Sequence, residues 1–443
     1  MTQLLQRLLF LFVPLSGLAA MPATAAAGQP TPLVLDMQTR AELIDGWLED
    51  RVQNVLPALM RREGVDLWLI IGREYNEDPV LRTMLPSTWL SARRRTMLLI
   101  HDPGADQPLE TLAVARYSVG SVFEQAWDPE EQPDQWQRLA SLIADRDPER
   151  IGINLSEDFA LADGLAKTEH DLLRAALGPE LAARLYPAEG LAIGWLETRT
   201  EAEMIVYQQI CAIAHQIIAE GLSEMVIQPG VTTVADVQWW YRERVRELKL
   251  ISWFHPSVSI QRPVASEEKP TTIEPGDLLH VDFGITYLRL NTDTQQHAYV
   301  LKPGETEAPE ALRDALATGN RLQDILTSNF ISGRTGNEIL KATRDQAIAE
   351  GINPSIYTHP IGYHGHAAGP TIGLWDQQDG VPGKGDYPLY PNTAHSIELA
   401  AIFERPGWAK PMRIKLEEDA FFDGESDRYI DGRQTELYLI PRQ

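Results

Sequence analysis

The 443-residue sequence has little of several residue types that common protein functions require. Its single cysteine, Cys211, excludes an internal disulfide, and the apolar helical stretch around it predicts a buried residue rather than a nucleophile. Basic residues are also few, since 39 Lys and Arg stand against 63 Asp and Glu, for a formal net charge of −24. Such an acidic chain is a poor partner for nucleic acid or for an anionic membrane.

Long apolar runs are scarce too. The best candidate, Leu8–Ala20, is interrupted by Pro14 and is too short to span a bilayer. Arg7 precedes it and the alanine-rich residues 23–27 follow it, which is the pattern of a secretory signal peptide. We therefore expect residues 1–27 to be cleaved and the mature protein to be periplasmic or secreted, without membrane attachment.

The remaining chain is long enough for two domains. Residues 30–190 alternate strand and helix patterns and predict an α/β domain, whereas residues 198–443 predict a second, α+β domain. Thr200 and Glu203 form a capping-box pattern at the start of the second domain. Helices are expected at 40–62, 134–144, 160–176, 201–220, 234–248 and 331–351, and N-terminal strands at 67–71, 97–101, 112–116 and 151–154.

Two acidic residues lie on a predicted hairpin in the second domain. Residues 278–284 alternate apolar and polar side chains, which is the period of a strand, and residues 292–301 form the next strand. Pairing of the two strands would make Asp282 and Asp293 near-opposite neighbours, roughly 5 Å apart at Cβ. Residues 287–289 contain no Gly or Asn, so an irregular or longer turn is expected.

A second predicted hairpin has the same layout. Residues 395–400 and 413–419 flank a clear turn, Arg405–Trp408, and their pairing places Glu398 opposite Glu417. Like charges at such separations repel, so a cation is expected between the acids of each pair. Four carboxylates balance the charge of two divalent ions, and without metal such a buried cluster would hold protons.

The order and spacing of these residues, with the Gly/His-rich run 359–366 between the hairpins, resemble metallopeptidase family M24, the creatinase, methionine aminopeptidase and prolidase group. The resemblance covers residues 198–443 well and 35–190 more loosely. It implies a C-terminal "pita-bread" domain behind an N-terminal α/β domain with a ribonuclease-H-like layout. Within the family, the Xaa-Pro aminopeptidase branch is the most similar.

The resemblance also implies two divalent metal ions, with Mn expected first and Co, Zn or Fe as alternatives. The ligands it implies, in chain order, are Asp282, Asp293, His366, Glu398 and Glu417. It further implies that Asp293 and Glu417 bridge the ions and that Glu398 handles the proton of the attacking water.

Positions on the substrate side depart from the family. The place of a first auxiliary histidine falls near Ser266, and Trp375 stands in the place of a second one, so Trp375 is expected to contact substrate. His364 is a candidate catalytic replacement, with a structural loop histidine as the alternative. Gln295 or its neighbour, and Lys415, stand where relatives carry arginine.

The resulting expectation is metal-dependent hydrolysis of peptide bonds at the N-terminus of a peptide substrate, by an Xaa-Pro aminopeptidase or a dipeptidase. One alternative is a metal-binding protein of the same fold with lost or altered hydrolase activity. Another is a creatinase-like C–N hydrolase. A homodimer is left open.

Overall fold

The computed structural model describes residues 33–105, 107–263, 271–406, 408 and 410–442, and the predicted signal peptide, 1–27, and Ser266 lie outside them. The first part of the chain alternates helices and strands as expected. Its elements are α2 (Met37–Asn54), α3 (Leu56–Glu63), β1 (Leu67–Arg73), α4 (Pro79–Met84), β2 (Arg95–His101), β3 (Glu110–Val114), β4 (Glu124–Gln125), α5 (Gln135–Arg146), β5 (Ile151–Ile153), η1 (Ala160–Ala162), α6 (Lys167–Ala182), β6 (Leu185–Pro187) and α7 (Glu189–Glu197).

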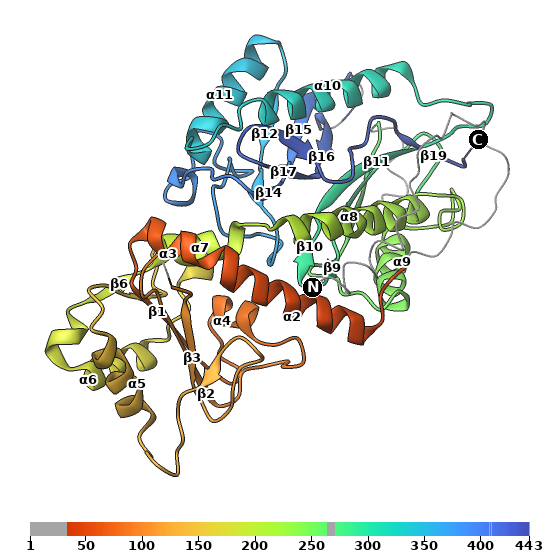
Figure 1. Ribbon diagram of the computed structural model, residues 1–443. Coiled ribbons are helices and arrows are strands. Elements are labelled where there is room, and N and C mark those ends of the chain that lie inside the picture. The colour runs from red at the N-terminus through yellow and green to blue at the C-terminus, as the bar shows by residue number, and fades with distance from the viewer. Residues whose placement is uncertain (1–32, 106, 264–270, 407, 409, 443) are drawn as a thin grey trace. The chain divides into compact units, whose positions relative to one another are not determined.

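These strands form one mixed sheet in the order β4-β3-β2-β1-β5-β6 (Figure 1). The sheet is covered on both faces, because Trp68 and Ile70 of β1 belong to a core with α2, α3 and α7, whereas Leu67, Leu69 and Ile71 belong to another with α5 and α6. A central strand buried on both faces is expected to be continuously apolar, as β1 is. The α/β fold predicted for the N-terminal part of the chain is confirmed.

The second part of the chain contains helices and mainly antiparallel sheets. Its elements are α8 (Glu201–Gly221), α9 (Val234–Glu247), β7 (Ser257–Gln261), β8 (Leu278–Phe283), β9 (Thr286–Tyr287), β10 (Leu290–Asn291), β11 (Thr294–Val300), α10 (Glu310–Thr327), α11 (Gly336–Ala349), β12 (Pro354–Ile356), β13 (His359–Pro360), η3 (Lys384–Asp386), β14 (Thr393–Ser396), β15 (Leu399–Phe403), β16 (Met412–Leu416), β17 (Asp419–Phe422), β18 (Asp427–Tyr429) and β19 (Tyr438–Ile440).

The register of the first acidic hairpin differs from the prediction. β8 pairs antiparallel with β11 so that Asp282 lies opposite Gln295, and Asp293 immediately precedes β11. The two acids are therefore diagonal neighbours rather than a directly opposed pair. Diagonal side chains on one face remain within reach of each other.

The turn of this hairpin is also different from the one expected. Leu290 pairs with Tyr287, so Leu288 and Arg289 form a tight two-residue turn in which both have positive φ, 54° and 65°. Asn and Gly usually occupy such positions. Here tertiary contacts hold the turn, since Leu288 is buried and the Arg289 guanidinium donates to two backbone carbonyls near the end of α4.

The second hairpin has the predicted register. Leu399 pairs with Leu416 and Ser396 with Asp419, which places Glu398 across from Glu417 between these pairs. α10, which the sequence analysis did not predict, packs on β15 and β16 (Figure 1). A Cβ on Gly319 of α10 would lie 2.9 Å from Leu416 Cδ1, so the glycine permits a close approach of the helix to the strand before Glu417.

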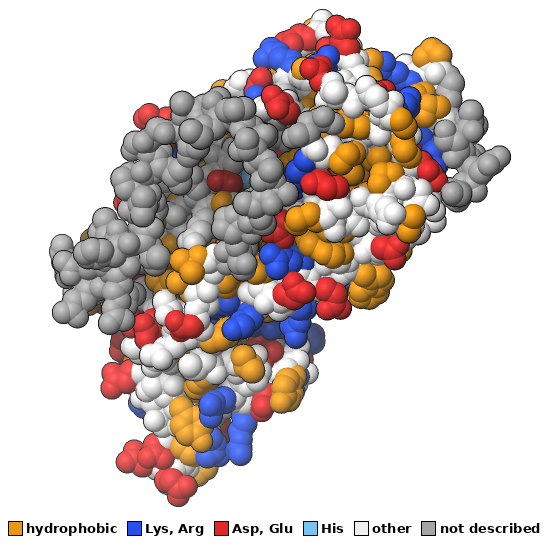
Figure 2. All heavy atoms as spheres, turned by 90° about the vertical axis from the view of Figure 1, so that its right-hand side faces the viewer, with side chains coloured by type: hydrophobic (Ala, Val, Ile, Leu, Met, Phe, Trp, Pro, Cys, Tyr) orange, Lys and Arg blue, Asp and Glu red, His pale blue; other side chains and the backbone are white. Residues whose placement is uncertain are grey.

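On the face shown in Figure 2, the described side chains include acidic and basic groups interspersed with one another.

Cys211 is buried, and its thiol donates a hydrogen bond to Asp419 Oδ2 at 3.5 Å. Burial raises the pKa of this thiol, and the predicted core position of Cys211 is confirmed. Within the described part of the chain, no helix has both the length and the hydropathy of a membrane span.

A buried ionic network joins the two parts of the chain at the start of α8. The predicted capping box forms, with the Glu203 carboxylate accepting from Thr200 N. The same carboxylate pairs with Arg51 of α2 at 3.0 Å and with Arg199 at 3.5 Å, and it accepts from the Tyr363 hydroxyl at 2.9 Å. Burial opposes ionisation, but Arg199 and Arg51 together lower the pKa of Glu203.

Replacing Glu203 by Gln should lower the free energy of unfolding by about 3–5 kcal/mol, because two buried guanidinium groups lose their counter-charge. Asp236→Asn is the matched control, since Asp236 holds the equivalent capping-box position on α9 but is exposed. Urea unfolding followed by circular dichroism measures both variants. An equal decrease in the free energy of unfolding of both variants would show that the capping box, and not the buried ion network, is responsible for the stabilisation.

Candidate metal centre

Potential metal ligands gather where the two hairpins meet. They form three overlapping groups, Asp282–Asp293–Glu417, His359–Glu398–Glu417 and Asp293–His359–His366, and the ligand atoms in each group lie within 4.8 Å of one another. All five predicted ligands are thus brought together. Asp293 and Glu417, the residues expected to bridge, each belong to two groups, as does His359.

His359 is a candidate ligand that the sequence analysis missed. It lies on β13 opposite Ser396 and is buried, with Nε2 3.4 Å from Glu417 Oε1 and 3.7 Å from Asp293 Oδ2. Its Nδ1 lies 3.0 Å from the backbone oxygen of Pro360, which fixes the proton on Nδ1. The Nε2 lone pair then faces two carboxylates, so three acceptors point at one another.

Such an arrangement fits a cation. Among the described residues, neither Asp293 Oδ1 nor His359 Nε2 has a hydrogen-bond partner, although both atoms are buried. Buried polar atoms normally find partners, and a metal ion would serve both of these. A histidine whose second nitrogen donates to a backbone carbonyl is also the usual form of a histidine ligand.

His366 and His364 differ in position. His366 is exposed, its ring centroid lies 4.7 Å from that of His359, and burial of part of the ring with the nearby His359 lowers its pKa to about 4. His364 belongs to none of the three groups. Burial lowers the pKa of His364 to about 4, and Arg82 and Arg199 act on it in the same direction. Its catalytic role stays a prediction without support from this geometry.

His255, which precedes β7, lies by α9 rather than at the cluster. Its ring contacts Trp239, and its Nδ1 lies 3.3 Å from an Arg242 nitrogen. His255 therefore does not take the place of the auxiliary histidine that the sequence lacks near position 266.

Gln295 organises the carboxylates. Its backbone pairs with Asp282 on one side and exchanges two hydrogen bonds with Glu417 on the other. Its side-chain amide donates to Glu398 Oε1 at 2.7 Å and to Glu417 Oε2 at 2.6 Å, and its carbonyl oxygen lies 2.7 Å from His280 Nε2. A neutral donor therefore stands between two acids.

Burial and mutual repulsion control the charge of the cluster. Burial raises the pKa of Asp282 to about 8, and Glu417 adds to this effect whereas Lys415 opposes it. Burial and then Glu417 also raise the pKa of Asp293 and of Glu398. The raised pKa values show that nearby positive charge does not offset the burial of Asp282, Asp293 and Glu398, and bound divalent ions would supply that charge.

Replacing His359 by Ala should lower the tightly bound Mn from about two ions per chain to one or none, because the buried imidazole faces both shared carboxylates. His366→Ala should retain most of the metal, and His364→Ala should retain all of it. Elemental analysis after dialysis measures the stoichiometry of the three variants. Loss of metal in His366→Ala with full occupancy in His359→Ala would identify His366 as the ligand instead.

Solved structures of other proteins share the fold of most of the chain. An X-Pro aminopeptidase from Thermotoga maritima MSB8 superposes with a TM-score of 0.61 at 16% identity, covering 86% of this chain and 99% of that one. An Xaa-Pro dipeptidase from Bacillus anthracis superposes with a TM-score of 0.57 at 17% identity, covering 91% of this chain and 100% of that one. A prolidase from Pyrococcus horikoshii OT3 superposes with a TM-score of 0.55 at 14% identity, covering 90% of this chain and 99% of that one.

The sequence itself carries the family assignment. The profile of metallopeptidase family M24 matches residues 207–422, which include every candidate ligand, whereas no characterised protein sequence matches the chain significantly. The pita-bread fold predicted for the C-terminal domain is confirmed by the structural matches. Residues 207–422 belong to metallopeptidase family M24, and through them the chain is a hydrolase of the metallopeptidase class.

Proposed function

We propose that the protein removes the N-terminal residue from short peptides, with Xaa-Pro dipeptides as the preferred substrate class and two divalent ions, Mn foremost, as cofactors. The proposal is supported by the solved structures of similar fold, which include an X-Pro aminopeptidase and an Xaa-Pro dipeptidase. Export from the cytoplasm, to a periplasm or to the medium, is part of the proposal and rests on the sequence of residues 1–27.

The observation that carries the proposal is a cavity of about 380 Å³ beside the ligand cluster. Asp282, Gln295 and Glu398 form one side of it, and Trp375 lies at the same cavity with three-quarters of its surface exposed. A small substrate therefore reaches the carboxylates directly from solvent. The remaining lining is Ser257, His280, Ser355, Tyr357, Leu399, Ala400, Arg413 and Lys415.

When bound, the two ions would lower the pKa of water and act as Lewis acids on the scissile carbonyl. The residues around them supply the rest of the chemistry. Glu398 faces the cavity with its carboxylate oriented by Gln295, and it can accept a proton from water and pass it to the leaving amine. Burial, with the neighbouring acids, raises the pKa of Tyr357 to about 12, so its phenol stays protonated and can donate to developing negative charge.

Two cations on β16 favour a substrate with a free carboxylate. Arg413, Lys415 and Glu417 alternate along the chain, so their side chains share one face of the strand. Lys415 lies two residues from the metal cluster, roughly 7 Å along the strand. Arg413 Nε is buried without a hydrogen-bond partner among the described residues. A dipeptide would place its C-terminal carboxylate near these cations, which a longer peptide would not.

The two alternatives make different predictions for the same site. A metal-binding protein without hydrolase activity would bind Mn and cleave no peptide. A creatinase-like C–N hydrolase would cleave creatine rather than peptides. The preserved set of carboxylate ligands favours the metal-dependent peptidase over the second alternative.

The Mn-loaded protein should cleave Ala-Pro faster than Ala-Ala, and Ala-Pro faster than its C-terminal amide. Lys415→Met should reduce kcat/KM for Ala-Pro roughly tenfold, as for loss of one charge-assisted hydrogen bond, and should leave the amide nearly unchanged. Amino acid release measured by chromatography decides both points. Metal binding without cleavage of any of the three peptides would support the non-catalytic alternative.

Trp375 should limit the size of the group beside the scissile bond. An indole N–H can donate a hydrogen bond but cannot carry a proton as an imidazole does. Trp375→Ala should retain two Mn ions and raise kcat/KM for bulky dipeptides relative to Ala-Pro, since the exposed ring narrows the cavity. Elemental analysis and a dipeptide panel test this together. An equal change in kcat/KM for all dipeptides of the panel would mean that the Trp375 ring does not contact the substrate.

A further inference from the structure

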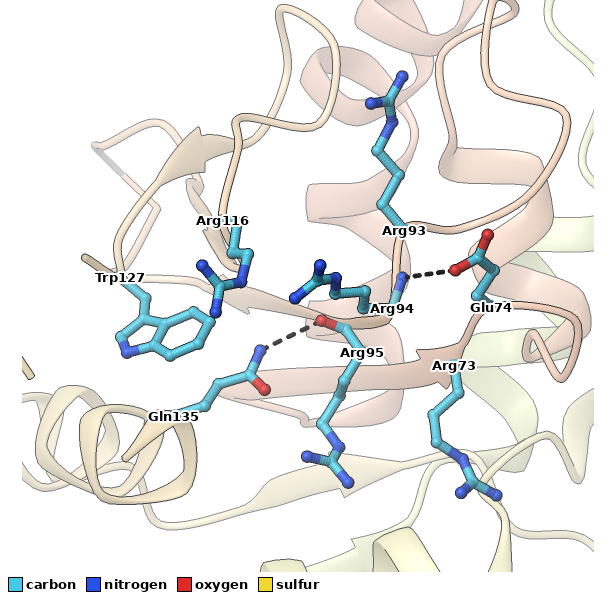
Figure 3. Close-up of a pocket in the computed structure, with 8 residues that line it drawn as sticks. All are labelled: Arg73, Glu74, Arg93, Arg94, Arg95, Arg116, Trp127 and Gln135. Atoms are coloured by element: carbon cyan, nitrogen blue, oxygen red, sulfur yellow. Dashed lines mark hydrogen bonds between the residues drawn. The ribbon is translucent and has the colours of Figure 1, made fainter. Parts of the chain in front are cut away.

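Arginine side chains gather at one end of the N-terminal sheet, away from the ligand cluster in sequence. They line a cavity of about 410 Å³. Its lining is Arg73, Glu74, Arg93, Arg94, Arg95, Arg116, Trp127 and Gln135 (Figure 3). In a chain of net charge −24, such a concentration of positive charge calls for a physical explanation.

The topology of the sheet produces this concentration. β1 ends at Arg73, β2 begins at Arg95, and the two residues are direct cross-strand partners. Arg116 follows the end of β3, the other neighbour of β2. Gln135 at the start of α5 fixes this end of the sheet, because its amide donates to the backbone oxygens of Arg95 and Val114.

Two of the arginines share one negatively charged partner. The buried Glu169 carboxylate lies 3.3 Å from Arg73 Nε and 2.6 Å from Arg95 Nε. Like charges placed opposite each other on neighbouring strands repel, and Glu169 relieves this repulsion. Glu169 and Glu74 together carry two negative charges, whereas the five arginines of the cavity carry five positive charges. Three positive charges at the cavity are therefore without a counter-charge.

The remaining guanidinium groups have no acidic partner among the described residues. Figure 3 shows those of Arg94 and Arg116 pointing toward each other across the cavity, beside Trp127, whereas Arg93 points away. Arg116 lies over the Trp127 ring, with its Cζ 5.6 Å from the ring centroid, so its position is held by an aromatic contact rather than by an anion. Two facing cations repel unless an anion lies between them.

The backbone at Arg94 adds an independent observation. Its φ of 55° is in the left-handed region, which residues with a side chain rarely adopt. Glu74 holds this conformation, because its backbone N–H donates to Arg94 O at 2.6 Å and its carboxylate accepts from Arg94 N. A disfavoured conformation that aims a guanidinium into a cavity is typical of a binding site.

We propose that this cavity, the arginine cavity, binds a dianionic oxyanion, either free phosphate or the phosphate group of a small phosphomonoester, between Arg94 and Arg116. Guanidinium groups bind phosphate oxygens in a bidentate manner, and a dianion matches the excess charge better than a single carboxylate does. The acids elsewhere on the chain do not prevent this, because charges farther away than about 8 Å are largely screened at physiological ionic strength.

Isothermal titration of the full-length protein with inorganic phosphate, with phosphoserine and with acetate tests the proposal. Arg94→Gln and Arg116→Gln should each weaken phosphate binding roughly tenfold or more. Arg174→Gln on α6 is the matched control, since it removes one exposed arginine from the same domain outside the cavity, and it should not change the affinity. Tighter binding of phosphoserine than of phosphate would identify a phosphomonoester as the ligand, and the reverse would identify free phosphate.

Arg94→Lys keeps the charge but loses the guanidinium fork, and it should weaken binding less than Arg94→Gln. Circular dichroism checks that each variant is folded. For the unmodified protein, affinity for phosphate should fall as NaCl is raised, so the proposal can be tested even if a variant does not fold. Absence of saturable phosphate binding, equal weakening by Arg174→Gln, or equally tight binding of acetate would overturn it.

Discussion

The C-terminal part of the protein depends on the burial of four carboxylates within a few ångströms of one another. Two like unit charges 4.8 Å apart repel by roughly 3.5 kcal/mol at an effective dielectric constant of 20. Asp293 and Glu417 each belong to two of the three groups of potential metal ligands. Lys415 offsets only part of this repulsion at Asp282 and Glu398. The fold therefore holds together a cluster that requires added positive charge, and two divalent ions have the matching charge.

The surrounding structure positions the carboxylates of the cluster. Gln295 connects strands on both sides of it and donates to two of its acids. Gly319 lets α10 approach the strand that leads to Glu417. Tyr363 ties the run that contains His359 to the buried Glu203. The ion network at the junction between the two parts of the chain is thus connected to the run that carries His359.

Sequence reasoning succeeded where local signals set the geometry. The turn signal in the sequence between residues 405 and 408 predicted the register that places Glu398 opposite Glu417, and the paired strands have this register. It failed for the first hairpin, because the Leu288–Arg289 turn has a conformation that only tertiary contacts explain. His359 was missed since its strand has two residues and its partner, Ser396, is distant in sequence. The arginine cavity could not be predicted either, because three strand ends must meet to form it.

The central proposal is that the shared carboxylates would hold two metal ions, with His359 as the buried imidazole ligand. Anomalous diffraction at the Mn absorption edge, from crystals grown with Mn, tests it most directly. Two anomalous peaks are expected, both beside Asp293 and Glu417, and one of them beside His359 Nε2. A single peak, or peaks that contact neither Glu417 nor His359, would contradict the account.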